Sequence, residues 1–146
     1  MPDITNLAAY RFAPLGELGP LRDELREFCA VLRMRGTILL SPEGINVVVA
    51  GEPEACARLL VRLRSLPGLA DLPAKVSKSD HQPFNRMLVK IKKEIIACGV
   101  VGIDPAQRPA PRIAPQQLKQ WLDEGRALTL LDARNRYEVK LGTFRG

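Results

Sequence analysis

The chain has 146 residues, a formal net charge of +6, and 46% hydrophobic and 26% charged residues, a composition that excludes a disordered or membrane-embedded protein. This length corresponds to one ordinary domain, or to one small domain and part of another. No apolar run approaches the ~20 residues of a membrane helix, and the first fifteen residues lack the apolar core of a secretory signal, so we expect a cytoplasmic protein.

The amino-terminal segment predicts a strand followed by a helix. Apolar residues in 6–12 alternate over a short stretch that ends before Pro14, as expected for a strand. Residues 18–34 then change to helical spacing, and Gly36 is a typical residue after the end of a helix. The apolar positions of this helix are Leu18, Leu21, Leu25, Phe28 and Leu32.

The next segments predict a β-hairpin and a second helix. Residues 37–40 and 45–50 are rich in β-branched side chains and are separated by Ser41-Pro42-Glu43-Gly44, a sequence typical of a tight turn. Both runs are apolar on both faces, which favours central strands. Residues 52–66 form an amphipathic helix with acidic side chains in the first turn, where the helix dipole favours them.

Two further extended segments complete a first domain over residues 1–98. Residues 74–80 and 87–97 are separated by a turn, and residues 87–97 alternate in the manner of a half-buried strand. The resulting order of β, α, β, β, α, β and one more strand predicts a ferredoxin-like, or acylphosphatase-like, α+β domain. The right-handed crossover rule leaves few other ways to connect these elements.

A linker rich in proline and glycine follows over residues 99–114. Beyond it we predict a helix over 115–124 and a buried strand over 128–131. Residues 115–146 are too few to bury a core of their own. We therefore expect this segment to be the beginning of a second domain, and the chain to be the front part of a longer protein.

The excess of positive charge lies in the second half of the chain. Residues 1–66 carry eight basic and eight acidic side chains, whereas 67–146 carry fourteen and eight. Residues 75–93 contain six basic side chains and a single acidic one, Asp80. Such a density suggests a polyanion partner, although a solvated strand face would have the same composition. Lys90 and Lys92 share one strand face, and Phe84 within this segment could stack on a nucleotide base.

The sequence contains few candidates for catalysis or cofactor binding. The motifs GxGxxG, GxxxxGK[ST], HExxH and GxSxG are absent. The cysteines Cys29, Cys56 and Cys98 form no CxxC pair, and the first two lie at apolar helix positions typical of core packing. His81 lies in a turn, where local hydrogen bonding is a commoner role than metal ligation. Trp121 has the helical spacing of a packing residue.

Three segments of the chain resemble a known protein family. They are Gly36–Asn46 (GTILLSPEGIN), Lys90–Ile95 (KIKKEI), and Leu131–Asn135 (LDARN) with the following Leu141–Gly146 (LGTFRG). Together they resemble the bacterial rhodanese-domain-containing tRNA uridine hydroxylases, which oxidise the wobble uridine to 5-hydroxyuridine. The resemblance covers essentially the whole chain, and its last segment is typical of the opening of a rhodanese domain.

The resemblance implies a tRNA-modifying oxidoreductase whose first domain contributes tRNA binding. The reactive cysteine of a rhodanese domain would follow this chain, so we expect no catalytic residue within it and no activity from it alone. Asp132 and Arg134 would support loops near the active-site end of the rhodanese domain. The side chains predicted to contact RNA are Lys75, Lys78, Phe84, Arg86, Lys90 and Lys92.

Two other functions are compatible with the sequence. One is a rhodanese-type sulfurtransferase that carries a persulfide on a cysteine after this chain. The other is a non-catalytic module that binds RNA or protein. Glu43 and Asn46, beside the predicted hairpin turn, either satisfy backbone groups there or belong to a functional surface.

Overall fold

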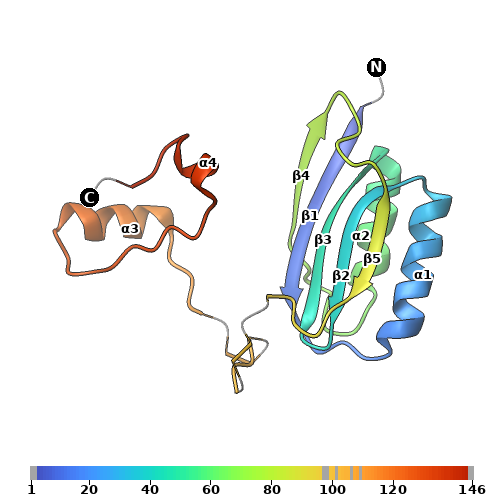
Figure 1. The fold of residues 1–146 in the computed structure, drawn as a ribbon, viewed down its shortest axis with the longest axis horizontal. Coiled ribbons are helices and arrows are strands. Elements are labelled where there is room, and N and C mark those ends of the chain that lie inside the picture. Colours follow the sequence, from blue (N-terminus) through green and yellow to red (C-terminus); the bar gives the residue numbers. More distant parts are fainter. Residues whose placement is uncertain (1–2, 97–98, 101, 106, 109, 145–146) are drawn as a thin grey trace. The chain divides into compact units, whose positions relative to one another are not determined.

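The computed structural model describes residues 3–96, 99–100, 102–105, 107–108 and 110–144. The chain divides into two compact units, Met1–Ala110 and Pro111–Gly146. The first unit contains a sheet and two helices (Figure 1). In chain order its elements are β1 (Ile4–Phe12), α1 (Leu18–Val31), β2 (Arg35–Ser41), β3 (Gly44–Gly51), α2 (Pro53–Arg64), β4 (Ala74–Ser79) and β5 (Met87–Ile91).

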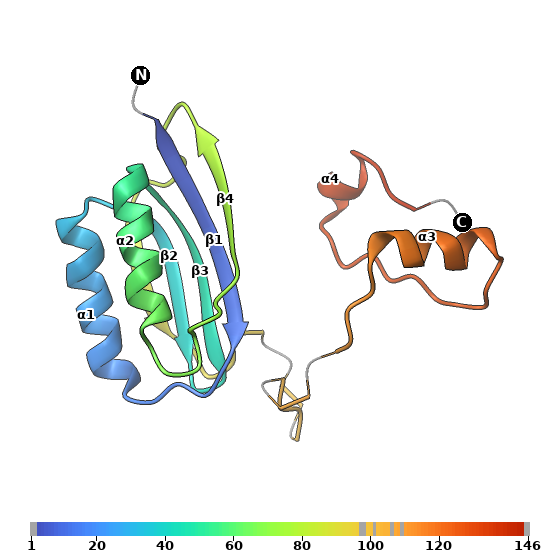
Figure 2. The same cartoon turned by 180° about the vertical axis from the view of Figure 1, so that it is seen from behind.

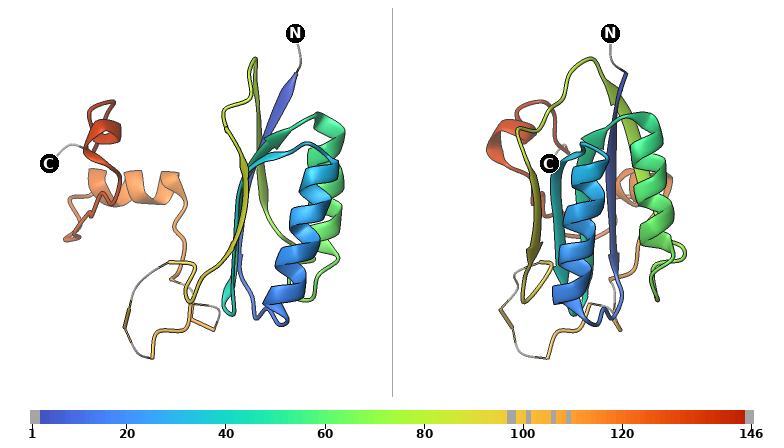
Figure 3. Two further views of the ribbon diagram at one scale, coloured as in Figure 1. Left: turned by 45° about the vertical axis from the view of Figure 1, so that its right-hand side comes forward. Right: turned by 90° about the vertical axis from the view of Figure 1, so that its right-hand side faces the viewer.

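The five strands form one mixed sheet in the order β4-β1-β3-β2-β5. All neighbouring strands are antiparallel except β2 and β5, which are parallel. Both helices lie on the same face of the sheet (Figure 2), and the view along the sheet in Figure 3 shows no helix of the described part of this unit on the other face. This arrangement confirms the predicted ferredoxin-like, acylphosphatase-like α+β domain.

Alternating side chains of the central strands form the core with the two helices. Leu7, Ile38 and Val47 lie on the covered face and are at most 1% exposed, as are Leu25 of α1 and Leu59 of α2. Burial of each such side chain contributes roughly 1.5–3 kcal/mol. The side-chain period of two then directs every second residue to the opposite face of the sheet.

The opposite face, which carries no helix among the described residues of this unit, is called the open face. The strand residues directed towards it follow from the register of the paired strands. They are Ile4, Asn6, Ala8, Tyr10 and Phe12 of β1; Gly44, Asn46, Val48 and Ala50 of β3; Arg35, Thr37, Leu39 and Ser41 of β2; Lys75, Ser77 and Ser79 of β4; and Leu88 and Lys90 of β5.

Helix α1 ends three residues before the predicted end at Met34. Arg33 takes a left-handed conformation with φ 51°, and the amide of Met34 donates to the carbonyl of Cys29 at 2.9 Å. A left-handed residue that closes the last turn is a common helix end, although glycine usually occupies it. The turn directs Met34 into the core, where it is 2% exposed.

Strand β5 is also shorter than the predicted 87–97. Its partner β2 ends at Ser41. The amide of Lys92 still donates to the carbonyl of Leu40, and the residues after Lys92 extend past the end of β2. The amide of Ile95 instead donates to the carboxylate of Glu43 at 2.6 Å. A side chain of the hairpin turn therefore holds the segment that leaves the sheet.

The second unit contains α3 (Pro115–Asp123) and the short helix α4 (Arg136–Val139). The predicted strand at 128–131 was wrong, because these residues have no partner strand among the described residues of this unit. Leu131 is 89% exposed. Helix α4 was not predicted, although its capping box, formed by Asn135 and Glu138, is visible in the sequence as a cap residue followed three positions later by glutamate. None of the helices described is long and apolar enough to cross a membrane.

Gly36 at the start of β2 provides a test of the close approach between β2 and β3. A Cβ at this position would lie 2.3 Å from the carbonyl oxygen of Val48, and the backbone has φ +134°. Gly36→Ala should therefore lower the free energy of unfolding by about 2–4 kcal/mol and the Tm by roughly 8 °C or more. Thermal unfolding followed by circular dichroism measures both values.

Gly19→Ala is the matched control. Gly19 lies in α1, and nothing lies within 4 Å of the position that a methyl group would occupy there. Since alanine is the better helix former, this variant should be neutral or more stable by about 0.5–1 kcal/mol. Equal losses in the two variants would contradict the close strand approach at Gly36.

Candidate nucleic-acid interface

The structure separates the basic segment 75–93 into two groups at opposite edges of the sheet. Lys75 and Lys78 lie on β4, whereas Lys90 lies on β5, and three strands separate these two. With strands about 4.8 Å apart, the two edges are about 19 Å apart. The sheet topology thus places charges that are close in the chain on opposite edges, and the predicted RNA contacts of this segment do not form one continuous basic surface.

The lysines also differ in the face of the sheet to which they belong. Lys75 pairs with Ala8, and Lys90 pairs with Leu39, so both lie on the open face. Lys78 pairs with Thr5, which is buried on the helix side, and its ammonium group forms an ion pair with the carboxylate of Asp3. The charge of Lys78 is thus partly compensated within the protein.

The connection between β4 and β5 carries the remaining predicted RNA contacts. Gln82 donates from Nε2 to the carbonyl of Ala50 at 3.1 Å, and its Oε1 accepts from the amide of Phe84 at 3.2 Å. Phe84 is half-buried in this connection, whereas Arg86 is exposed at the start of β5. The carbonyl of Arg86 accepts from the amide of Gly36 at 2.9 Å. This connection therefore covers one end of the open face.

The open face combines positive edges with an exposed aromatic centre. None of its strand positions is occupied by aspartate or glutamate, whereas Arg35, Lys75 and Lys90 are basic. Tyr10 in the inner strand β1, next to the edge strand β4, is 46% exposed. Its ring packs edge-on against Phe12, with centroids 6.3 Å apart and an interplanar angle of 85°.

Sequence reasoning did not select Tyr10 as a site residue. The sequence does contain a signal for its exposure. Side chains alternate between the two faces of β1, so Tyr10 and Phe12 lie on the face opposite to the buried Leu7 and Ala9. The side chain of Asn46 lies beside Tyr10, because the two residues are paired between β1 and β3. Asn46 thus belongs to the open face, while Glu43 binds a backbone amide as a turn residue.

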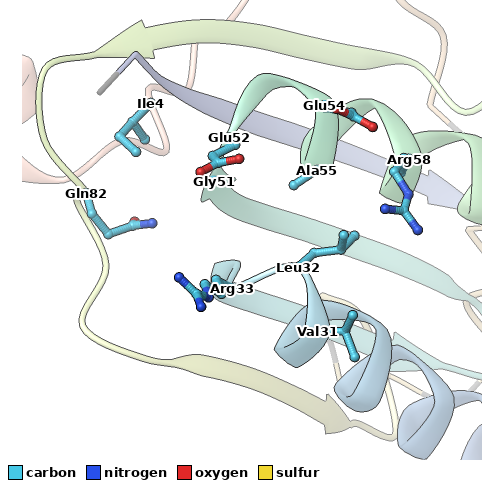
Figure 4. Close-up of a pocket in the computed structure, with 10 residues that line it drawn as sticks. All are labelled: Ile4, Val31, Leu32, Arg33, Gly51, Glu52, Glu54, Ala55, Arg58 and Gln82. Carbon is cyan, nitrogen blue, oxygen red and sulfur yellow. The ribbon is translucent and has the colours of Figure 1, made fainter. Parts of the chain in front are cut away.

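A cleft of about 440 Å³ lies between the end of α1 and the start of α2. Figure 4 shows Arg33 on one side and Glu52 and Glu54 on the other, with Gln82 of the β4–β5 connection beside them. Two arginines and two carboxylates line this cleft, the second arginine being Arg58. The balanced charge gives the cleft no preference for a polyanion.

The two described cysteines are buried in the core, as predicted. Burial, with a smaller contribution from the neighbouring Cys56, raises the pKa of the Cys29 thiol to about 11. Burial also raises the pKa of Cys56, whose Sγ donates to the carbonyl of Thr5 at 3.4 Å. A nucleophile needs a thiolate, so neither residue is suited to that role. Cys98 lies outside the described residues.

His81 forms a local interaction, and no metal site occurs in the described part of the chain. Its Nδ1 lies 2.5 Å from Oδ1 of the adjacent Asp80, and both side chains are exposed. Among the described residues, no group of three or more histidine, cysteine, aspartate or glutamate side chains could hold a metal ion.

Asp132 and Arg134 form a clamp within the second unit. The guanidinium of Arg134 donates from Nε to Oδ1 of Asp132 at 2.9 Å and from a terminal nitrogen to Oδ2 at 2.6 Å. It also donates to the carbonyl of Gly142 at 2.9 Å, and the hydroxyl of Thr143 donates to Asp132. The hydrogen bonds that the Asp132 carboxylate accepts hold its pKa well below the usual range, and the bonds from the Arg134 side chain have the largest effect. The pair thus ties the segment around residue 142 to the start of α4.

Comparison with known proteins assigns the first unit to a class. The family model described as the UPF0176 acylphosphatase-like domain matches residues 4–95, which include the whole sheet and both of its helices. The chain therefore belongs to this family.

Curated relatives match both units of the chain. A tRNA uridine(34) hydroxylase of Variovorax paradoxus is 46% identical over 100% of this chain and 57% of its own length. Proteins of the same name from Cupriavidus pinatubonensis and Bordetella parapertussis are 45% and 42% identical, over 97% and 100% of this chain. The chain spans 52–61% of the length of these three relatives.

Solved structures support the fold. The structure titled "BlrP1 BLUF" superposes with a TM-score of 0.52 at 18% identity, over 64% of this chain and 66% of its own. A complex of Klebsiella pneumoniae BlrP1 gives the same TM-score at 16% identity, over 84% of this chain and 33% of its own. At such identities the likeness concerns the fold alone.

The buried thiols predict low reactivity towards alkylating reagents. A rise in pKa from 9.0 to about 11 lowers the thiolate fraction of Cys29 at pH 8 about 100-fold. In a Cys98→Ser chain, iodoacetamide should therefore label the native protein at least ~100-fold more slowly than the protein in denaturant. Mass spectrometry of timed samples gives both rates, and equal rates would contradict the burial of these residues.

Proposed function

We propose that the chain is the amino-terminal part of a tRNA uridine(34) hydroxylase and that its first domain contributes tRNA binding. The observation that carries this proposal is the identity of 42–46% to proteins of that name over nearly the whole chain, including the second unit. Identity confined to the first domain would have supported only a shared module.

The chemistry of the described residues favours a binding role for the first domain. Its two described cysteines have raised pKa values, and no metal-binding cluster occurs in the described residues. A surface with positive edges and no carboxylate on its strands suits the phosphate backbone of an RNA, since basic side chains that contact phosphates release counterions. The first domain would thus hold the tRNA while residues of the longer protein perform the oxidation.

The second unit fits the beginning of a rhodanese domain in this proposal. Its clamp between Asp132 and Arg134 would brace the first loops of that domain, in agreement with a supporting role. Several of its apolar side chains are largely exposed, including Leu131 at 89% and Leu141 at 90%. Such exposure fits an element that packs against further parts of a larger domain. The reactive cysteine would lie in those parts.

The proposal predicts loss of one tRNA modification in a strain that lacks the gene. Mass spectrometry of nucleosides from bulk tRNA should show no 5-hydroxyuridine in the deletion strain, and the full-length gene should restore it. Undiminished 5-hydroxyuridine would contradict the proposal. A thiosulfate:cyanide sulfurtransferase assay on the full-length protein tests the sulfur-transfer alternative.

Reversing charges at the β5 edge should weaken tRNA binding. Lys90 lies in β5, and Lys92 is exposed just after its end at Ile91. Lys90→Glu and Lys92→Glu together would remove two groups proposed to bind phosphate. The slope of log affinity against log salt concentration should fall by about 2, since each phosphate contact contributes about 1. Fluorescence anisotropy with labelled tRNA at several salt concentrations measures affinity and slope.

A control with the same change in net charge separates a local contact from a general field effect. Arg26 of α1 and Arg58 of α2 are exposed on the helix side. The Arg26→Glu/Arg58→Glu chain should keep the wild-type slope. Equal loss of slope in both double variants would show that only the net charge matters, and would contradict a tRNA contact at the β5 edge.

A further inference from the structure

We propose that Arg35 and Arg86 together form a phosphate-binding site for RNA at the beginning of the ladder between β2 and β5. This inference rests on the proposed function and specifies where the first domain holds the RNA backbone most strongly. The RNA contacts predicted from the sequence included Arg86 but not Arg35, because the two residues lie far apart in the chain.

The parallel pairing of β2 and β5 places the two arginines side by side. The first paired positions of this ladder are Gly36 and Met87, and Arg35 and Arg86 directly precede them. The amide of Gly36 donates to the carbonyl of Arg86 at 2.9 Å, so the two backbones are joined at this point. Neighbouring strands lie about 4.8 Å apart, and both arginine side chains are exposed. One anion can therefore contact both guanidinium groups.

No carboxylate of the described residues compensates this pair of charges. Neither Arg35 nor Arg86 takes part in an ion pair with another residue that the structure describes. Glu52 and Glu54 line the cleft between the two helices, where two other arginines balance them. Like charges at neighbouring positions of a sheet are destabilising, so the pair lowers stability until an anion lies between its members. An arrangement that sacrifices stability in this way indicates binding rather than a structural role.

The lysines at the other end of β5 are better compensated than the arginine pair. Lys90 and Lys92 continue the positive row along this edge of the sheet. The carboxylate of Glu43 holds the amide of Ile95, three residues after Lys92, and Glu94 follows Lys92 by two positions. Acidic groups thus lie close to the lysine end. The arginine end of the edge is where an incoming phosphate meets the least compensated positive charge.

The chemistry of the pair suits a phosphate that belongs to a chain. A guanidinium presents a planar fork of donors that binds two phosphate oxygens at once, which an ammonium group does not. The positive row from Arg86 to Lys92 is about 20 Å long at about 3.3 Å per residue. This length exceeds that of a single small anion and corresponds to several nucleotides. The row therefore favours an RNA strand along the edge, with one phosphate between the two arginines.

The test compares tRNA binding by variants of the chain, followed by fluorescence anisotropy at several salt concentrations. Arg35→Gln/Arg86→Gln should weaken binding about 10- to 100-fold and lower the slope of log affinity against log salt concentration by about 2. Arg35→Lys/Arg86→Lys keeps both charges and should keep the slope, but should bind about 3- to 10-fold more weakly because the bidentate hydrogen bonds are lost. Arg26→Gln/Arg58→Gln, with the same loss of charge on the helix side, is the matched control and should bind as wild type does.

Thermal unfolding of the free chain separates binding from a structural role. Replacement of either arginine by glutamine removes the repulsion between the two and should raise the Tm by up to about 5 °C. Stability and tRNA affinity should thus change in opposite directions in the same variants. A lower Tm in both Arg35→Gln and Arg86→Gln would assign these side chains to the fold and overturn the inference.

Chemical modification of the unaltered chain keeps the test independent of the variants. Phenylglyoxal reacts with exposed arginines, and mass spectrometry of the peptides locates the modified residues. Saturating tRNA should suppress the modification of Arg35 and Arg86 and leave that of Arg26 and Arg58 unchanged. Equal rates at Arg35 and Arg86 with and without tRNA would overturn the inference.

Further outcomes decide between RNA and other occupants. A glutamine double variant within about twofold of wild type in tRNA affinity, or a lysine double variant equal to wild type, would overturn the arginine site. Poly-glutamate that binds as tightly as tRNA would assign the pair to an acidic protein, and displacement of tRNA by millimolar inorganic phosphate would assign it to a free anion.

Failure of this inference is distinguishable from failure of the proposed function. If the arginine variants are neutral while the wild-type chain binds tRNA and 5-hydroxyuridine depends on the gene, only the arginine site is wrong. A wild-type chain without measurable affinity for tRNA would contradict the binding role of the first domain itself.

Discussion

The architecture of the first unit depends on the burial of one face of the sheet by two helices. Side chains such as Leu7, Ile38 and Val47 are almost completely inaccessible there, and a shift of register by one residue would expose all of them. The same constraint determines which residues occupy the open face. The two sides of the same strand therefore differ: Leu7 and Ala9 of β1 are part of the core, whereas Tyr10 lies on the open face.

The strand order converts a local concentration of charge into a surface with two positive edges. Residues of β4 and β5 are neighbours in the chain but form the opposite edges of the sheet. Between them lie the strands that carry Tyr10 and Asn46. A ligand that contacts both edges must therefore cross the open face.

Hydrophobic periodicity was sufficient to predict the elements of the first unit and its α+β class, because burial acts on each strand and helix through its own spacing. Periodicity carries no information on which strands are neighbours, so it could not show that Lys75 and Lys90 lie about 19 Å apart across the sheet. It also predicted a strand at 128–131, since an apolar run does not reveal whether a partner strand is present. Tyr10 was not selected because its position opposite Leu7 and Ala9 in the alternating pattern indicates exposure of a side chain but not its role.

Chemical-shift mapping of the isotope-labelled chain during titration with an anticodon stem-loop RNA tests the central claim most directly. The account predicts that the largest changes fall on the open face, at the amides of Tyr10 and Asn46 and on the edge strands β4 and β5, with small changes in α1 and α2. Changes confined to the two helices, with the open face unaffected, would contradict it.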